Sequence, residues 1–249
     1  MSQHQPKIFI FTGSGISAES GLTTFRGSDG LWNNHSIDDV CNEHTWRQNY
    51  ALVHDFYNDL RQTLAETEPN QAHYSIAELQ QRYGSAVQLV TQNVDDLLER
   101  AGATDVLHLH GNLSELRCSD CDHEWDIGYT LVDLNDARHL QCPDCGHDSQ
   151  CVRPNIVFFG GPAPYYQTMY RWLGEASHPQ SLFIVSGTQG NVVPIDSFMA
   201  QVDGRKILNN LEPSPYIDEH NYSKSFYEPA TQAWPQIVDI VEEHVAQHW

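Results

Sequence analysis

The chain has 249 residues, of which 40% are apolar and 18% charged, and its formal net charge is −20. This size and apolar content suit one large domain, or one domain with an inserted lobe, and exclude a disordered chain. The negative charge argues against nucleic acids and anionic membranes as partners and favours basic peptides. No apolar run approaches a membrane span and no signal peptide is visible, so we expect a cytoplasmic protein.

Strand-like and helical runs alternate along the chain. Apolar or β-branched runs that predict strands occupy residues 7–13, 86–93, 106–111, 155–161, 181–188 and 206–212. Helical patterns occupy residues 50–66, 72–84, 95–102 and 233–249. This alternation predicts an α/β fold, a Rossmann-like parallel sheet with helices on both faces. Residues 114–154 interrupt it and predict a small inserted zinc-ribbon and helical lobe within a single domain spanning residues 1–249.

Several of the predicted strands end in a polar or glycine-rich cluster. These clusters are residues 13–26, 92–95, His110, 187–190 and 210–212. In open parallel sheets, ligands bind beyond the carboxyl ends of the strands. We therefore expect these clusters to face one crevice.

The first cluster, Gly13 to Ala18, fits the pattern G-x-G-x-x-A after a strand. Glycines let the backbone approach a pyrophosphate, and a helix N-terminus supplies donors to it. The pattern also fits a simple glycine turn without a ligand. About twenty residues further on there is no strand ending in a ribose-binding acid, which argues against an ordinary dehydrogenase.

The cysteines form two C-x2-C pairs with twenty residues between them, namely Cys118, Cys121, Cys142 and Cys145. This spacing predicts a tetrahedral zinc ribbon, and four thiolates leave no open position, so we expect one structural zinc. The alternatives are two disulfides or a redox pair. A cytosolic location disfavours disulfides, and a redox motif needs no second copy. His123, His147 and Cys151 lie nearby as alternative ligands.

Seven segments carry a family resemblance. They read TGSGISAESGLTTFRG, TQNVDDLLERAG, LHLHGNL, the two cysteine pairs, VRPNIVFFGG, SGTQGNVVP and NNLEPS, and they span nearly the whole chain. In these segments the sequence resembles the sirtuin family of NAD-dependent protein lysine deacylases. It is most similar to the short bacterial sirtuins.

The resemblance implies roles for individual residues. It implies two catalytic residues, His110 as the catalytic histidine and Asn93. The implied NAD contacts are Gly13, Ser14, Gly15, Ile16, Ser17, Ala18, Glu19, Phe25, Arg26, Trp32, Gln92, Asn93, Val94, Asp95, Gly187, Thr188, Gln189, Asn210, Leu211, Glu212 and Ala230. The implied contacts to the acyl-lysine are Tyr57, Arg61, Val157 and Phe159. Segment 21–27 matches the family's lid over the nicotinamide ribose.

The chemistry of these residues agrees with the implied reaction. Breaking the bond to nicotinamide, while an acyl-lysine oxygen is held against the ribose, requires positioning and exclusion of water. Asn93 and Asp95 offer a carboxamide an acceptor and a donor. His110 suits a general base because imidazole titrates near neutral pH. His108 alternates with His110 on the predicted strand, so we expect it on the opposite face, in the core.

Simpler interpretations exist for two of the motifs. In TQNVDD, Asn93 or Asp95 can cap the helix that follows. SGTQGNVVP can be an ordinary turn at a strand end. The chain also departs from the family at Ser14, Gly161 and Gln189, where alanine, glutamate and serine are usual.

Acyl preference depends on one helix. Family members that remove succinyl or malonyl groups carry a tyrosine followed three residues later by an arginine. Here Tyr57 is in place, Leu60 stands at the arginine position, and Arg61 follows. A shift of one residue rotates the side chain by about 100°. We therefore interpret Arg61 as a solvated surface charge and expect deacetylation as the main activity. The alternatives are removal of succinyl or malonyl groups, an ADP-ribosyltransferase or NAD-consuming enzyme, and an inactive NAD-binding module.

Overall fold

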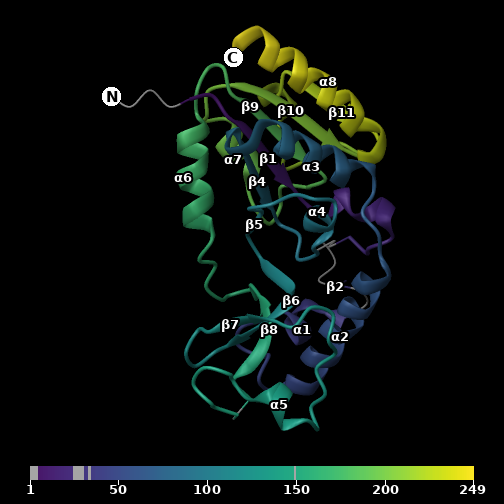
Figure 1. Cartoon of the computed structure of the whole chain (residues 1–249), viewed down its shortest axis with the longest axis vertical. Coiled ribbons are helices and arrows are strands. Elements are labelled where there is room, and N and C mark those ends of the chain that lie inside the picture. Colours follow the sequence, from purple (N-terminus) through teal and green to yellow (C-terminus); the bar gives the residue numbers. More distant parts are fainter. Residues whose placement is uncertain (1–4, 25–30, 33–34, 149) are drawn as a thin grey trace.

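The computed structural model describes residues 5–24, 31–32, 35–148 and 150–249. The molecule is elongated, with a larger part built on a parallel sheet and a smaller part built on an antiparallel sheet (Figure 1). Among the described residues, no helix combines the length and the apolar character needed to cross a membrane.

The larger part contains a six-stranded sheet in the order β11-β10-β9-β1-β4-β5, with every neighbouring pair parallel. Its strands are β1 (Ile8–Thr12), β4 (Val87–Thr91), β5 (Leu107–His108), β9 (Leu182–Ser186), β10 (Arg205–Asn210) and β11 (Lys224–Tyr227). All residues of β1, β4 and β9 are buried, as in strands covered on both faces. The predicted α/β fold with a parallel sheet is confirmed.

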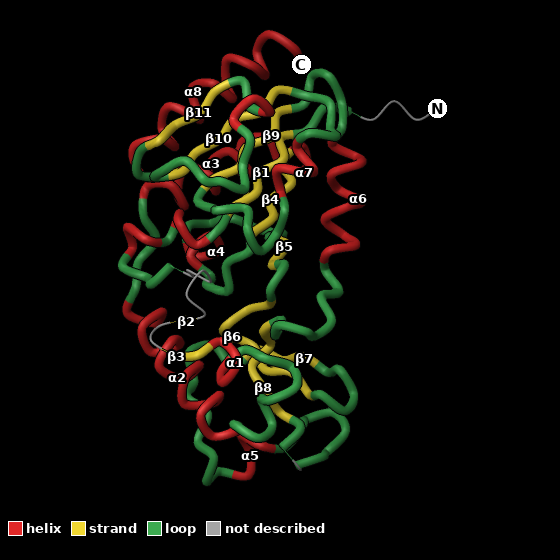
Figure 2. Tube along the Cα trace, turned by 180° about the vertical axis from the view of Figure 1, so that it is seen from behind, coloured by secondary structure: helices red, strands yellow, loops and turns green. Residues whose placement is uncertain are grey.

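Alternate residues of β1 feed two cores, because successive side chains point to opposite faces of a strand. Ile8 and Ile10 pack with the helices α3 (Gln71–Tyr83) and α8 (Ala230–His248). Phe9 and Phe11 pack with α6 (Tyr166–Ala176) and α7 (Ile195–Met199). Figure 2 shows α6 standing at the side of the sheet, where the chain arrives from the smaller part.

The smaller part holds the strands β6 (Gly111–Cys118), β7 (Glu124–Asp126) and β8 (Val152–Ile156), in the order β7-β6-β8. The predicted strand at 155–161 is wrong in place and partner. The strand covers 152–156, and it pairs antiparallel with β6 instead of joining the parallel sheet. The reason is that β6 begins directly after the turn at His110, and β8 pairs with one of its edges.

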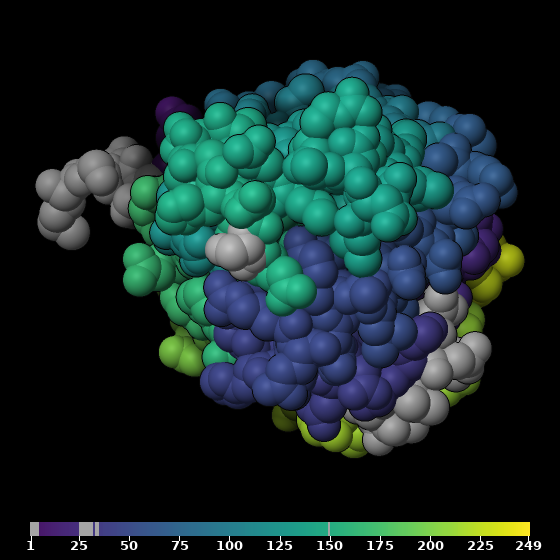
Figure 3. All heavy atoms as spheres, turned by 90° about the horizontal axis from the view of Figure 1, so that it is seen from below, coloured from purple at the N-terminus to yellow at the C-terminus, as the bar shows by residue number. Residues whose placement is uncertain are grey.

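The smaller part also recruits helices from earlier in the chain. α1 (Ile37–Val40) and α2 (Tyr50–Glu66) share a buried core with residues of β6 and β8, and α5 (Ala137–Leu140) packs beside it. α2 has the bounds that the sequence predicted. On the face shown in Figure 3, the teal residues of the zinc ribbon lie against the blue residues of α1 and α2.

The remaining elements are short. They are β2 (Leu31–Trp32), β3 (His35–Ser36), α4 (Leu97–Arg100), and the 3-10 turns η1 (Ser14–Ile16), η2 (Ala18–Ser20), η3 (Gly84–Ala86) and η4 (Glu219–Asn221). Most of the polar and glycine-rich clusters that the sequence singled out follow β1, β4, β9 and β10, at the carboxyl edge of the large sheet.

Candidate active site and metal centre

The loops after β1 and β9 meet where the strand order of the large sheet reverses. The amide of Gly13 donates to the Ser186 carbonyl at 3.0 Å, and that of Gly15 to the Gly187 carbonyl at 2.8 Å. A Cβ added to Gly13 would stand 2.7 Å from the Gly187 oxygen, and one added to Gly15 would stand 2.7 Å from the Gly187 Cα. Glycine at these two positions thus lets the loop after β1 pack closely against the loop after β9. They also leave a cradle free of side chains at the switch point, where such sheets bind ligands.

The chain continues from this cradle through η1 and η2 rather than through a long helix. Ile16 is fully buried and Ser17 is 1% exposed, so both point into the protein. The lid residues Phe25 and Arg26, which the sequence singled out, lie outside the described residues. Trp32 packs edge-on against Phe56, with ring centroids 5.2 Å apart.

Side chains tie together three of the loops that the family resemblance assigns to NAD contacts. Nε2 of Gln92 donates to Oγ1 of Thr188 at 2.9 Å. The amide of Thr188 donates to Oδ1 of Asn210 at 2.9 Å, and Nδ2 of Asn210 donates back to the Thr188 carbonyl at 2.8 Å. The ends of three strands, β4, β9 and β10, are therefore tied together along the edge where the sequence predicts a crevice.

Other predicted contacts lie at the rim of this edge. Leu211 is 66% exposed, and Gln189 and Glu212 are exposed as well. The carboxylate of Glu19 accepts hydrogen bonds from the amide and hydroxyl of Thr231, at 2.9 and 2.7 Å, beside Ala230 at the start of α8. Glu19 thus closes a helix N-terminus, where a negative charge is favoured.

Four polar side chains, three of them buried, form one hydrogen-bonded cluster beside the loops that follow β1 and β4. The Ser17 hydroxyl donates to Oδ2 of Asp95 at 3.0 Å, and Nδ2 of Asn93 donates to the Ser17 oxygen at 3.1 Å. Nε2 of His73, on α3, lies 3.3 Å from the same oxygen. Oδ1 of Asn93 is buried and has no hydrogen-bond partner among the described residues. An unpaired buried amide oxygen is costly, so it suits a donor from a ligand, such as a carboxamide NH₂.

The directions of the hydrogen bonds in this cluster depend on the N-cap of helix α3. The amide of Asn70 donates to Nδ1 of His73 at 3.1 Å, as half of a capping box. Burial lowers the pKa of His73 to about 4, so the ring is neutral and carries its proton on Nε2. Nε2 therefore donates to Ser17. With two donors already on its oxygen, Ser17 directs its own proton to Asp95.

Asp95 is the titrating member of the cluster. Burial raises the pKa of its carboxyl to about 6, against the lowering effect of the hydrogen bonds from Ser17 and from the Leu97 amide. The Leu97 amide donates to Oδ1 at 3.3 Å, so the capping role proposed for Asp95 is present as well. Above that pH the Asp95 carboxylate is ionised and accepts one hydrogen bond on each oxygen, from Ser17 and from the Leu97 amide.

His110 lies in the turn between β5 and β6, and its predicted position on a strand is wrong. β5 ends at His108. The chain turns because Gly111, at φ 85°, passes so close to the Asn155 carbonyl that an added Cβ would overlap it, 1.9 Å away. Nδ1 of His110 lies 3.0 Å from the Gln92 carbonyl, and burial lowers the pKa of the imidazole to about 4. The ring is therefore neutral at physiological pH.

His108 has a clear partner set of its own. Its Nδ1 lies 2.9 Å from the Asn93 carbonyl and its Nε2 lies 2.8 Å from Oε1 of Glu99. Burial disfavours the charged ring, but Glu99 and the Asn93 carbonyl outweigh this and raise the pKa of His108. His108 thus anchors the backbone that carries Asn93, a role more specific than the core position that the sequence suggested.

The metal centre lies in the smaller part. The Sγ atoms of Cys118, Cys121, Cys142 and Cys145 all lie within 4.8 Å of one another. Cys118 and Cys145 have their sulfurs 3.8 Å apart, and Cys121 and Cys142 have theirs 3.7 Å apart. A tetrahedral zinc with Zn–S bonds of about 2.3 Å separates its sulfurs by about 3.8 Å, whereas a disulfide bond is about 2.05 Å. The residues fit a zinc ion, which would hold both knuckles together.

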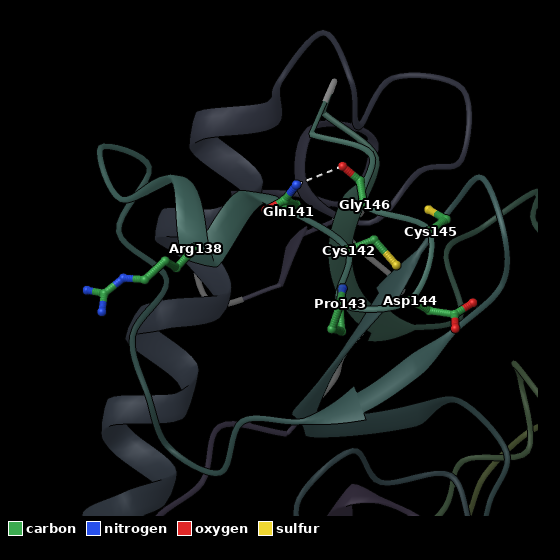
Figure 4. A pocket seen from close by; sticks show the side chains of 7 residues that line it. All are labelled: Arg138, Gln141, Cys142, Pro143, Asp144, Cys145 and Gly146. Atoms are coloured by element: carbon green, nitrogen blue, oxygen red, sulfur yellow. Dashed lines mark hydrogen bonds between the residues drawn. The ribbon is translucent and has the colours of Figure 1, made fainter.

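Figure 4 shows the second knuckle from its outer side, where Nε2 of Gln141 donates to the Gly146 carbonyl at 2.9 Å and closes the turn around Cys142 and Cys145. A hollow of about 410 Å³ lies here, lined by residues 138 and 141–146. It is open to solvent and contains no residue of the crevice, so it is not the active site.

The comparisons with known proteins agree with this geometry. A family model described as the Sir2 family matches residues 13–194. The chain belongs to the Sir2 family. An NAD-dependent protein deacylase of Helicobacter hepaticus is 39% identical over 258 residues, covering 96% of this chain and 98% of the relative. One of Campylobacter jejuni is 41% identical over 235 residues, covering 94% and 95%.

Solved structures of Sir2 homologues share the fold. A mutant Sir2 homologue in complex with ADP-ribose superimposes with a TM-score of 0.80 at 30% identity, covering 96% of this chain and 93% of that one. A Sir2 homologue in complex with NAD gives 0.79 at 31% identity, covering 95% and 90%.

In this sirtuin, one of the residues expected to hold the acyl-lysine, Val157, lies beside His110. The amide of Val157 donates to the His110 carbonyl at 2.9 Å, and Phe159 is 42% exposed. Tyr57 is fully buried, and its ring stacks on Phe158 with centroids 6.1 Å apart.

The interpretation of Arg61 as a solvated charge is wrong. Its side chain is fully buried, with Nε donating to the Leu113 carbonyl at 2.9 Å and Nη1 to Oδ1 of Asn58 at 2.8 Å. Burial lowers the pKa of this guanidinium to about 10. Sequence reasoning missed this because the partners on β6 become neighbours of α2 only in the fold. Arg61 ties α2 to the smaller part.

The departure at Gly161 also has a structural explanation. A Cβ added there would stand 2.9 Å from Oε2 of Glu43, and Glu43 in turn lies 3.7 Å from Nη2 of the buried Arg153. A side chain at residue 161 would therefore displace the Glu43 carboxylate, which faces Arg153.

Two residues of the site carried no sequence signal. His73 lies inside an ordinary amphipathic helix pattern, and Tyr166 lies outside all the family motifs. Each enters the site only through a contact across 56 residues, His73 with Ser17 and Tyr166 with His110.

Proposed function

We propose that this sirtuin removes acyl groups, and acetyl foremost, from protein lysines at the expense of NAD. The acyl group passes from the lysine nitrogen to a ribose oxygen. With one water consumed, the products are free lysine, nicotinamide and O-acyl-ADP-ribose. The observation that carries the proposal is the unpaired, buried Oδ1 of Asn93, on the loop whose preceding residue, Gln92, bonds to a neutral His110. The curated relatives, named NAD-dependent protein deacylases, support it.

The roles proposed for the residues follow from their donors and acceptors. Asn93 Oδ1 accepts from the nicotinamide carboxamide, and Asp95 supplies a second acceptor when ionised. His110 accepts a proton from a ribose hydroxyl at Nε2, because its Nδ1 proton is held by the Gln92 carbonyl. The glycine cradle at Gly13 and Gly15 takes the pyrophosphate.

A second candidate concerns the acyl group. Nη2 of Arg61 is buried without a hydrogen-bond partner among the described residues, on the same helix as the buried Tyr57, which would suit a succinyl or malonyl carboxylate. We favour acetyl because the other two bonds of the guanidinium hold it to β6 and Asn58, so it is not free to form a bidentate fork.

The substrate and compartment follow from charge and thiols. We propose lysine-bearing proteins or peptides as partners, and neither nucleic acid nor membrane, because a net charge of −20 attracts basic chains and repels phosphate-rich surfaces. We place the enzyme in the cytoplasm, because a cluster of four thiolates needs reducing surroundings.

The test is nicotinamide release from NAD, measured with an acetyl-lysine peptide, with the same peptide unacetylated, and with none. We expect release only with the acetylated peptide, together with stoichiometric O-acetyl-ADP-ribose. Equal release without peptide would identify an NAD-consuming enzyme, and transfer of label from NAD to protein would identify an ADP-ribosyltransferase. No release under any condition would leave a binding module.

A further inference from the structure

His110, the proposed catalytic base, has a second hydrogen-bond partner, and this partner lies outside the family motifs. The hydroxyl of Tyr166, the first residue of α6, lies 3.0 Å from Nε2 of His110. The two rings are tilted by 32° with their centroids 6.1 Å apart, so the contact is made by the hydroxyl and not by stacking. Figures 1 and 2 show the start of α6 facing the junction between the two parts of the molecule.

The direction of this hydrogen bond is fixed by the atoms around it. The Gln92 carbonyl can only accept, so Nδ1 of His110 carries the proton, and Nε2 of the neutral ring has only its lone pair. Burial raises the pKa of Tyr166 to about 12, so its phenol keeps its proton. Tyr166 therefore donates and Nε2 accepts.

A neutral imidazole nitrogen has one lone pair in the plane of its ring and accepts one good hydrogen bond. A general base must direct that lone pair at the hydroxyl from which it takes a proton. The phenol and a substrate hydroxyl are therefore alternative partners of Nε2. We propose that Tyr166 caps the base in the free enzyme and is displaced by a ribose hydroxyl of NAD; this rests on the proposed function.

The surroundings of Tyr166 allow such a displacement. Its side chain is only half-buried, and it lies at the end of a helix rather than within one. Its ring meets Tyr170 one turn further on, with centroids 6.2 Å apart, and Tyr170 is 47% exposed. A rotation of one side chain at the helix start is enough to release the base, without movement of the sheet.

The test compares the wild type with Tyr166→Phe, which removes the hydroxyl and keeps the ring. Nitrogen NMR of labelled histidine, with the His110 signals assigned through His110→Gln, reports the bond at Nε2 directly. We expect the Nε2 shift to differ between the two free proteins and to coincide once NAD is bound. Tyr170→Phe, on the same helix, should match the wild type in both states.

Kinetics give a second readout. Without the competing bond, the KM for NAD should fall about 2- to 10-fold while kcat stays within about twofold. A loss of kcat of about tenfold or more at unchanged KM would make Tyr166 a proton-transfer residue and overturn the cap. Equal Nε2 shifts in the free proteins would overturn it as well, and so would a difference that persists with NAD. If NAD changes neither spectrum, the displacement fails, and nicotinamide release with the acetylated peptide decides the proposed function separately.

Discussion

The hydroxyl of Ser17 lies 3.0 Å from the carboxylate of Asp95, a residue 78 positions further along the chain. This bond joins the glycine loop after β1 to the polar loop after β4. Asn93 and His73 both donate to the same hydroxyl oxygen, so the orientation of the proposed nicotinamide acceptors depends on one serine.

Asp95 should set the acidic limb of the pH profile of kcat/KM. Its pKa is raised to about 6 by burial, and we expect activity to rise as pH increases through that value, because the ionised carboxylate is the acceptor. Ser17→Ala removes a hydrogen bond that lowers this pKa, so the limb should move to higher pH. Ser20→Ala, in η2, is the control. A limb that stays in place in Ser17→Ala would contradict the assignment.

Asp95 should also lower the free energy of unfolding at neutral pH. Its folded pKa of about 6 lies above the ordinary value of 3.8, so the folded protein holds the proton more tightly than the unfolded chain. The free energy of unfolding therefore falls as pH rises from about 4 to 6. Asp95→Asn should remove this dependence and raise the Tm at pH 7, while activity drops. Chemical denaturation at pH 4.5 and 7 measures the free energy of unfolding of both proteins. An equal change with pH in the variant and the wild type would contradict the prediction.

His110→Ala should abolish peptide-dependent deacylation, with kcat/KM lower by about 10²–10⁴-fold. The side chain is half-buried, and its Nδ1 bond is to a loop carbonyl, so the fold should survive. Calorimetric titration with NAD should show that much of the binding remains. His178→Ala, at a loop far along the chain, serves as the control, and near-normal turnover in His110→Ala would exclude the base assignment.

The metal should be one zinc per chain with four thiolate ligands. Cys145→Ser should lose the metal and destabilise the smaller part, because the exposed contact between Nδ1 of His147 and Oδ2 of Asp120, at 3.1 Å, is a weak crosslink between the two knuckles compared with the metal. Cys151→Ser is the matched control: its sulfur is buried next to the cluster and 3.4 Å from the His147 carbonyl, yet it lies outside the four. Elemental analysis of freshly purified proteins decides the point. Zinc lost from Cys151→Ser would show that the ligand set is different.

Acyl preference should respond to residue 60 and not to residue 61. We expect the wild type to favour acetyl-lysine over succinyl-lysine on the same peptide. Leu60 is half-buried at the edge of the core around Tyr57, and Leu60→Arg restores the spacing of succinyl-removing relatives, so it should raise the kcat/KM for succinyl-lysine relative to acetyl-lysine.

Arg61→Ala is the counterpart of that variant. Because Arg61 bonds to β6 and Asn58, we expect a loss of about 2–4 kcal/mol in the free energy of unfolding and no change in the ratio of the two activities. A succinyl preference in the wild type that disappears in Arg61→Ala would show that Arg61 binds the acyl carboxylate.

The sequence by itself determined the fold class, the metal ligands and the family. These depend on local signals: apolar runs of strand length, a helical period over 50–66 that matches α2, and fixed spacings between cysteines and glycines. Such signals lie within a few residues of one another, so no knowledge of the fold is needed to interpret them.

The tertiary structure alone decided which side chains complete the site. His73 reaches Ser17, Tyr166 reaches His110, and Arg61 reaches the Leu113 carbonyl, each across more than fifty residues. Gly111 turned His110 out of the predicted strand because it must pass against the Asn155 carbonyl. A helical tyrosine, histidine or arginine looks the same in any sequence. Its role depends on what packs against it, and the fold of distant segments sets that packing.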